Sequence, residues 1–156
     1  MTRIPEDAQQ AWDLDWFAVD GEGRLAHFTS LGRPLPASIA VSWEDLRQVQ
    51  RYFRTAPALG GEPRVAPGLE AREVFATQDM RERYLRDFRA MGERGLYAYD
   101  LEPRGRGWVY RRVILPEVPL LLEELPGPVR AIVGRTVLTL ASFARDAAFD
   151  GPSLNP

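Results

Sequence analysis

His27 is the only histidine of the chain and the side chain best suited to acid–base chemistry. A catalytic histidine needs a carboxylate that orients it and a hydroxyl or water within hydrogen-bonding reach. Two nearby serines, Ser30 and Ser42, lack the G-x-S-x-G sequence that exposes a nucleophilic serine. We therefore expect His27 to be a structural or interface residue, and we identify no catalytic residue.

Four acidic residues are close together near the N-terminus: Asp13, Asp15, Asp20 and Glu22. A calcium loop of the EF-hand type requires oxygen ligands at alternating positions, and Phe17 occupies one of them. We interpret these acidic residues as turn and strand-end residues. Asp15 and Asp100 could form the carboxylate pair of a glycosidase, but nothing in the sequence places them together. With one histidine and no cysteine, we predict no metal site and no cofactor.

Basic and aromatic residues are interleaved in the segment 102–112. The candidate partner-binding residues are the arginines Arg104, Arg106, Arg111 and Arg112. Arginine and tryptophan are enriched in the hot spots of protein interfaces. Trp108 and Tyr110 point to the same side of a strand, so we expect them to pack inward while Arg104 and Arg106 stay exposed at the turn. The same pattern could bind nucleic acid, but all 20 basic residues are arginine, a bias typical of a GC-rich genome, which weakens that interpretation.

Composition is that of an ordinary globular domain. The 156 residues are 45% hydrophobic and 27% charged, with a net charge of −2. A chain of this length buries roughly 70% of its unfolded surface, enough for a core without disulfides. The absence of cysteine favours a cytoplasmic protein. We expect no signal peptide and no membrane span, because the N-terminus lacks an apolar segment and prolines interrupt the most apolar tract, 113–125.

The elements that must position these residues are two hairpins and two main helices. Residues 15–30 predict a β-hairpin that turns at Asp20-Gly21-Glu22-Gly23. Strands at 96–100 and 108–115 predict a second hairpin with a loop at 102–107. We expect Trp16 and Phe28 of the first hairpin to lie in the core.

Both main helices have an amphipathic pattern. Ser42 is expected to cap the first, with Asp45 at the third helical position. Its predicted buried stripe is Trp43, Leu46, Val49 and Phe53. The second helix is predicted over 78–91, and its apolar stripe is expected to contain Met80, Tyr84, Phe88 and Met91.

These elements predict one α+β domain over residues 1–156, with a mostly antiparallel sheet built from hairpins and packed against the two helices. Short helices near 120–125 and 129–133 and a strand near 136–140 complete it. The Pro- and Gly-rich segment 55–69 predicts an exposed internal loop. Residues 1–12 and 151–156 are expected to be flexible.

The segment 15–32 (DWFAVDGEGRLAHFTSLG) resembles the opening of a family of small, largely uncharacterised bacterial proteins. That family has the pattern D-W-F-x-x-D-x-x-G-x-[IL]-A-x-F-T-[ST]-x-G, followed by a proline. Residues 95–100 (GLYAYD) are similar to its G-L-[YF]-x-Y-D strand. The resemblance implies an immunity protein associated with polymorphic toxins, and it carries over no catalytic residue.

Three functional hypotheses follow. The leading one is a non-enzymatic binding protein that neutralises a cognate toxin by direct protein–protein contact, with no membrane partner. The second is a nucleic-acid or small-ligand binding module that uses the segment 102–112. The third is an enzyme of unrecognised type. The sequence does not indicate an oligomeric state.

Overall fold

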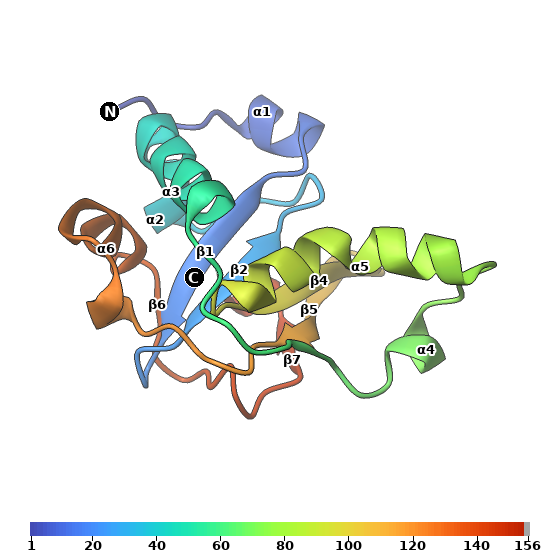
Figure 1. The fold of residues 1–156 in the computed structure, drawn as a ribbon. Helices are drawn as coiled ribbons and strands as arrows, with labels where there is room; N and C mark the ends of the chain where they lie inside the picture. Colours follow the sequence, from blue (N-terminus) through green and yellow to red (C-terminus); the bar gives the residue numbers. More distant parts are fainter. Residues whose placement is uncertain (155–156) are drawn as a thin grey trace.

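A computed structural model describes residues 1–154, which form an α+β fold around a seven-stranded mixed sheet (Figure 1). The strands are β1 (Asp15–Asp20), β2 (Leu25–Thr29), β3 (Arg64–Val65), β4 (Tyr97–Arg104), β5 (Gly107–Leu115), β6 (Val137–Leu138) and β7 (Ala148–Asp150). Their spatial order is β3-β5-β4-β2-β1-β6, and β7 also pairs with β5. The α+β prediction is confirmed.

Both predicted hairpins are present. β1 pairs antiparallel with β2, and β4 pairs antiparallel with β5. However, β2 pairs with β4 and β1 pairs with β6 in the parallel direction, so the sheet is mixed. Parallel pairing of β2 with β4 is possible because a long connection that contains helices joins them. This connection carries the chain back to the start of the sheet, so that β4 runs in the same direction as β2.

The helices are α1 (Glu6–Ala11), α2 (Ala37–Ala40), α3 (Trp43–Thr55), α4 (Leu69–Arg72), α5 (Gln78–Glu93) and α6 (Gly127–Val133), with short 3-10 turns η1 (Leu122–Glu124) and η2 (Pro152–Leu154). The predicted cap of α3 is confirmed, because the Ser42 hydroxyl accepts a hydrogen bond from the Asp45 amide at 3.2 Å. Within the described residues, no helix is long and apolar enough to cross a membrane.

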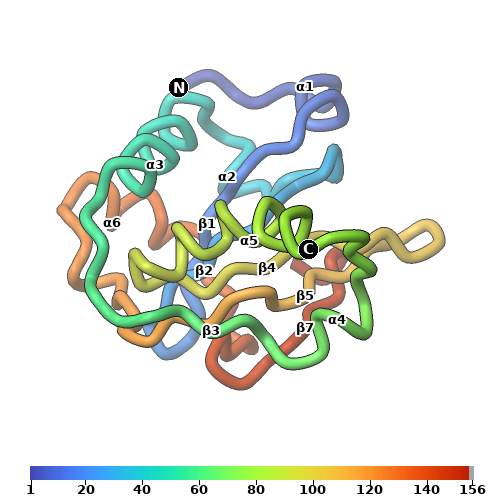
Figure 2. Tube along the Cα trace, turned by 45° about the vertical axis from the view of Figure 1, so that its right-hand side comes forward, coloured from blue at the N-terminus to red at the C-terminus, as the bar shows by residue number. Residues whose placement is uncertain are grey.

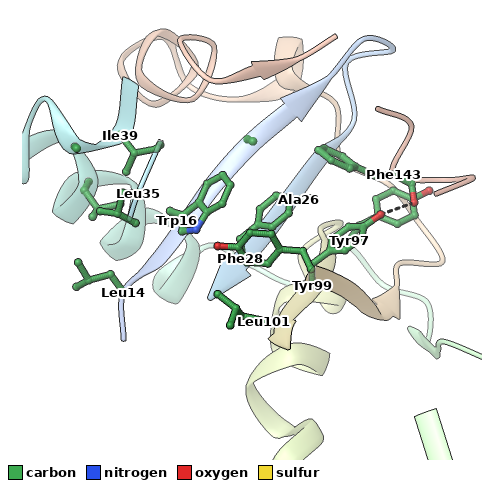
Figure 3. Close-up of a cluster of buried hydrophobic side chains, with 14 of the residues drawn as sticks. Leu14, Trp16, Ala26, Phe28, Leu35, Ile39, Tyr97, Tyr99, Leu101 and Phe143 are labelled. Carbon is green, nitrogen blue, oxygen red and sulfur yellow. Dashed lines mark hydrogen bonds between the residues drawn. The ribbon is translucent and has the colours of Figure 1, made fainter. Parts of the chain in front are cut away.

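The sheet is buried on both faces. One face carries stacked aromatic rings: Trp16 lies 4.2 Å from Phe28, and Phe28 lies 5.1 Å from Tyr99, centroid to centroid (Figure 3). The N-terminal segment, α2 and the segment around Phe143 cover this face. The other face packs against α3, α5 and α6. Two-sided burial explains why polar residues do not alternate with apolar ones along β1 and β2.

Several boundaries differ from the sequence prediction. Residues 1–12 were expected to be flexible, but they contain α1, and Ile4 is fully buried with its amide bonded to the carbonyl of Ala40. Residues 151–154 pack as η2 after β7, and residues 155–156 lie outside the described residues. The segment 55–69 is exposed over much of its length, but it contributes β3, and its end is anchored in the core by Ala66 and Leu69.

The buried stripe of α5 is also different. Met80 is exposed, whereas Leu85, Phe88 and Gly92 are buried. Phe88 is buried as predicted, and Tyr84 and Met91 are partly buried and packed against the core, so Met80 is the one predicted residue outside the stripe. Gly92 adds a contact that the prediction lacked: a Cβ there would lie 2.5 Å from the Ile114 side chain, so the helix meets β5 through a residue that has no side chain.

Candidate functional site

The β4–β5 hairpin projects from the molecule. In Figure 2 its tip, coloured gold, extends beyond the rest of the trace. The strands continue to a pairing of Arg104 with Gly107, so only Gly105 and Arg106 form the turn, and the predicted loop 102–107 is mostly strand. Gly105 has a φ of 56°, which favours glycine at this turn.

The four arginines predicted to bind a partner have different environments. Arg104 and Arg106 are exposed at the tip. Arg111 is half-buried and forms an ion pair with Glu102 across the hairpin. Arg112 is 9% exposed and donates hydrogen bonds to the carbonyls of Phe143 (2.6 Å) and Ala144 (3.0 Å). The assignment of Arg112 to a binding surface is therefore wrong: its guanidinium fastens the C-terminal segment to the sheet.

The base of the hairpin is packed as predicted. Tyr110 is 2% exposed, with its ring edge against Trp16 and Phe28. Burial raises the pKa of its hydroxyl to about 12. Trp108 is half-buried, and a Cβ on Gly151 would lie 2.0 Å from its ring, so the C-terminal segment closes on it. The exposed tip thus stands on a tightly packed base.

A second site is a cleft on the opposite face of the sheet, between α5, the end of α3 and the ends of β1, β2 and β4. Its volume is about 580 Å³. We call it the acidic cleft, because four aspartates line it: Asp13, Asp15, Asp87 and Asp100. His27, Thr29 and Tyr84 supply further polar groups, and Phe88 and Met91 supply apolar surface.

His27 lies behind Asp15 in this cleft. Its Nε2 is 2.9 Å from Asp15 Oδ1. The imidazole side chain is 5% exposed, whereas the Asp15 side chain is 57% exposed. A catalytic pair requires the reverse arrangement, with the base facing substrate and the carboxylate behind it. The geometry therefore makes His27 a support for the Asp15 carboxylate.

Asp100 is held from three sides. Its Oδ1 accepts hydrogen bonds from the Thr29 hydroxyl (3.0 Å) and the Leu101 amide (2.9 Å), and its Oδ2 accepts one from the Tyr84 hydroxyl (2.7 Å). Burial and the nearby negative charge of Asp100 raise the pKa of Tyr84. The tyrosine is thus a fixed donor that orients the Asp100 carboxylate.

Comparisons of the chain with protein-family models, curated proteins and solved structures gave no match. Function must therefore be inferred from the hairpin tip and the acidic cleft. Within residues 1–154, no three histidine or acidic side chains are grouped so that they could hold a metal ion.

The sequence prediction missed the acidic cleft. It found no carboxylate partner for His27, yet the register of the first hairpin pairs Asp15 with Thr29 and Phe17 with His27. Residues paired outward from the turn at 20–23 would have given this register in advance. It places Asp15 and His27 on the same face of the hairpin as diagonal neighbours. The meeting of Asp15 with Asp100 was not visible, because it depends on the parallel pairing of β2 with β4.

Proposed function

We propose that this protein is a non-enzymatic bacterial binding protein of the immunity type, which neutralises a cognate toxin by direct contact through the tip of the β4–β5 hairpin. The observation that carries the proposal is the pair Arg104 and Arg106, exposed on a projecting turn above a packed base. The toxin partner itself is inferred from the resemblance of residues 15–32 and 95–100 to immunity-associated bacterial proteins.

A packed base favours binding for an energetic reason. Ordering a flexible loop costs conformational entropy that reduces the affinity of a complex. Here Tyr110 is buried below the tip, and Glu102 lies between Arg104 and Arg111, with its carboxylate 3.8 Å from Arg104. The strands below the tip are therefore ordered before a partner binds, and Glu102 orients Arg104. A single arginine in the hot spot of an interface can contribute about 2 kcal/mol or more.

A protein partner fits this surface better than nucleic acid does. Phosphate binding needs several arginines free to neutralise a backbone. Arg112 is committed to the carbonyls of Phe143 and Ala144, and Glu102 pairs with Arg111 and lies 3.8 Å from Arg104. Two arginines at the tip, on a chain of net charge −2, make a compact interface patch rather than a basic track.

The test begins with identification of the partner by affinity capture from the source organism and mass spectrometry. Binding of that partner is then measured for a double charge reversal, Arg104→Glu with Arg106→Glu. We expect at least about a tenfold loss of affinity, because two exposed interface cations become repulsive. The melting temperature should fall only slightly, since neither side chain is buried and the exposed ion pair of Arg104 with Glu102 contributes little to stability.

The matched control is Arg86→Glu, which reverses an exposed arginine on α5 outside the hairpin. It should bind the partner with the affinity of the unmodified protein. An equal loss of affinity in the control and the tip variant would exclude the tip as the contact, and absence of any protein partner would overturn the proposed function.

A further inference from the structure

We propose that the exposed side of α3, together with Trp12 at the end of α1, binds an acidic peptide segment of a protein. We call this region the α3 surface, and it consists of Trp12, Trp43, Arg47, Arg51 and Arg54. None of these residues belongs to the β4–β5 hairpin, so the proposal does not rest on the function proposed for the hairpin tip.

The arginines of α3 lie on one side of the helix without carboxylate partners. Arg47, Arg51 and Arg54 are exposed, and their spacing of four and three residues places them on one face. Within residues 1–154, none of the three forms an ion pair. On α5, by contrast, Arg81 and Arg83 each pair with a carboxylate. Like charges one turn apart oppose helix formation, so an anionic ligand would relieve a repulsion that the folded protein maintains.

The carboxylates of α3 itself are engaged elsewhere. Glu44 accepts hydrogen bonds from the amide (2.9 Å) and the hydroxyl (2.7 Å) of Thr2. These bonds hold the pKa of the Glu44 carboxyl at about 2. Asp45 pairs with Arg135, which precedes β6. The helix therefore does not supply an anion to its own arginines.

Arg47 and Arg51 form the centre of the α3 surface. Asp13 and Asp15 line a cleft together with Arg54, and they partly offset its charge. The helix dipole also favours a cation in the last turn, where Arg54 lies. Arg47 is in the first half of the helix, so the dipole does not explain its presence. The cations that remain for a ligand are those of Arg47 and Arg51.

Aromatic rings continue the surface beside these cations. Trp12 is 52% exposed, and its ring centroid lies 5.6 Å from that of Trp43. The guanidinium of Arg47 stacks over the other ring of this pair, 4.8 Å from the Trp43 centroid. A stacked guanidinium keeps the N–H groups at its edge free to donate to a carboxylate. Trp12 adds apolar surface next to them, and tryptophan and arginine are the residue types that dominate interface hot spots.

Spacing and charge favour a peptide over a nucleic acid. Arg47 and Arg51 are about 6 Å apart along the helix axis. Carboxylates two residues apart in an extended peptide have nearly the same separation, about 6.6 Å. A phosphate backbone carries its charge continuously, and Asp13 and Asp15 at one end of the surface would repel it. The net charge of −2 adds to this repulsion.

The experiment is an NMR titration of the full chain labelled with ¹⁵N at low salt. The peptide acetyl-Glu-Glu-Leu-Glu-Glu-Leu-Glu-Glu-amide should shift the indole N–H signal of Trp12 and the backbone signals of Arg47 and Arg51. The same peptide with glutamine in place of glutamate should bind at least about tenfold more weakly, because hydrogen bonds to charged groups are the stronger ones. Equal or tighter binding of an oligothymidylate of similar length would identify a nucleic-acid site and overturn the proposal.

Variants with the same net charge complete the test. Arg47→Gln with Arg51→Gln should weaken binding of the glutamate peptide by at least about fivefold, as expected for the loss of two exposed ion pairs. The matched control, Arg64→Gln with Arg86→Gln, removes two exposed arginines outside the α3 surface and should bind as the unmodified protein does. Absence of shifts on α3, equal binding of the glutamine peptide, or equal weakening in both variants would overturn the proposal.

Discussion

At the scale of single residues, burial separates side chains of the same type into different roles. Arg104 and Arg112 are eight positions apart on one hairpin, yet the first is exposed and the second donates to buried carbonyls. His27 and Asp15 likewise form a hydrogen-bonded pair, and the role of each depends on which of the two side chains faces solvent. Residue type and spacing therefore identify candidates, and the exposed fraction of each side chain decides its role.

The aromatic stack gives a prediction at this scale. Trp16→Ala removes a ring that is 1% exposed and lies 4.2 Å from the ring of Phe28. The free energy of unfolding should fall by about 3–5 kcal/mol, because a large cavity would remain. Urea denaturation measures this loss. Trp12→Ala, at a position 52% exposed, is the matched control and should cost no more than about 1.5 kcal/mol for its contact with Trp43.

At the scale of elements, local signals were sufficient for some structures and not for others. The first hairpin and the start of α3 were predicted because turn residues and a cap lie within a few positions of the groups they bond. The parallel pair β2–β4 was not predicted, because its partners are about seventy residues apart and no local pattern encodes their meeting. The stripe of α5 was predicted for Tyr84, Phe88 and Met91 but not for its start, where Met80 is exposed, and the contact of Gly92 with β5 was not visible for the same reason.

The cap of α3 is the element whose contribution is easiest to isolate. Ser42→Ala deletes the oxygen that accepts the Asp45 amide, and it should lower the free energy of unfolding by about 1 kcal/mol. Ser42→Gly should cost only a few tenths of a kcal/mol, because glycine is itself tolerated at the N-cap position. Thermal denaturation of both variants checks the order. Equal stability of the alanine variant and the unmodified protein would contradict the capping role.

At the scale of the whole molecule, the sheet separates two surfaces with different properties. Its aromatic face is closed by the N-terminal and C-terminal segments, and it supports the hairpin tip from below. Its other face is covered by helices that leave the acidic cleft open where α3 and α5 end. Because both surfaces depend on strands that are far apart in the sequence, a change that loosens the central core would impair the tip and the cleft together.

The buried tyrosines give this molecule a distinct response to alkali. The chain has no lysine and no cysteine, so tyrosine is the residue type whose ordinary pKa, about 10, lies in the mildly alkaline range. The pKa is raised by burial, as the largest cause, in Tyr84, Tyr97, Tyr99 and Tyr110. The unfolded chain therefore loses these protons at lower pH than the folded protein does.

The sign of the effect follows from this difference. Stability is fully present below the unfolded pKa of about 10, and it is lost as the pH rises above that value, by about 1.4 kcal/mol per pH unit for each such tyrosine. Tyr110, whose pKa is about 12, contributes between pH 10 and 12. In Tyr110→Phe, the free energy of unfolding measured in urea should decline less steeply with pH over that window. Between pH 7 and 9 the free energies of unfolding of the two proteins should change with pH in parallel. If they remain parallel up to pH 12, Tyr110 ionises as readily in the folded protein as in the unfolded chain.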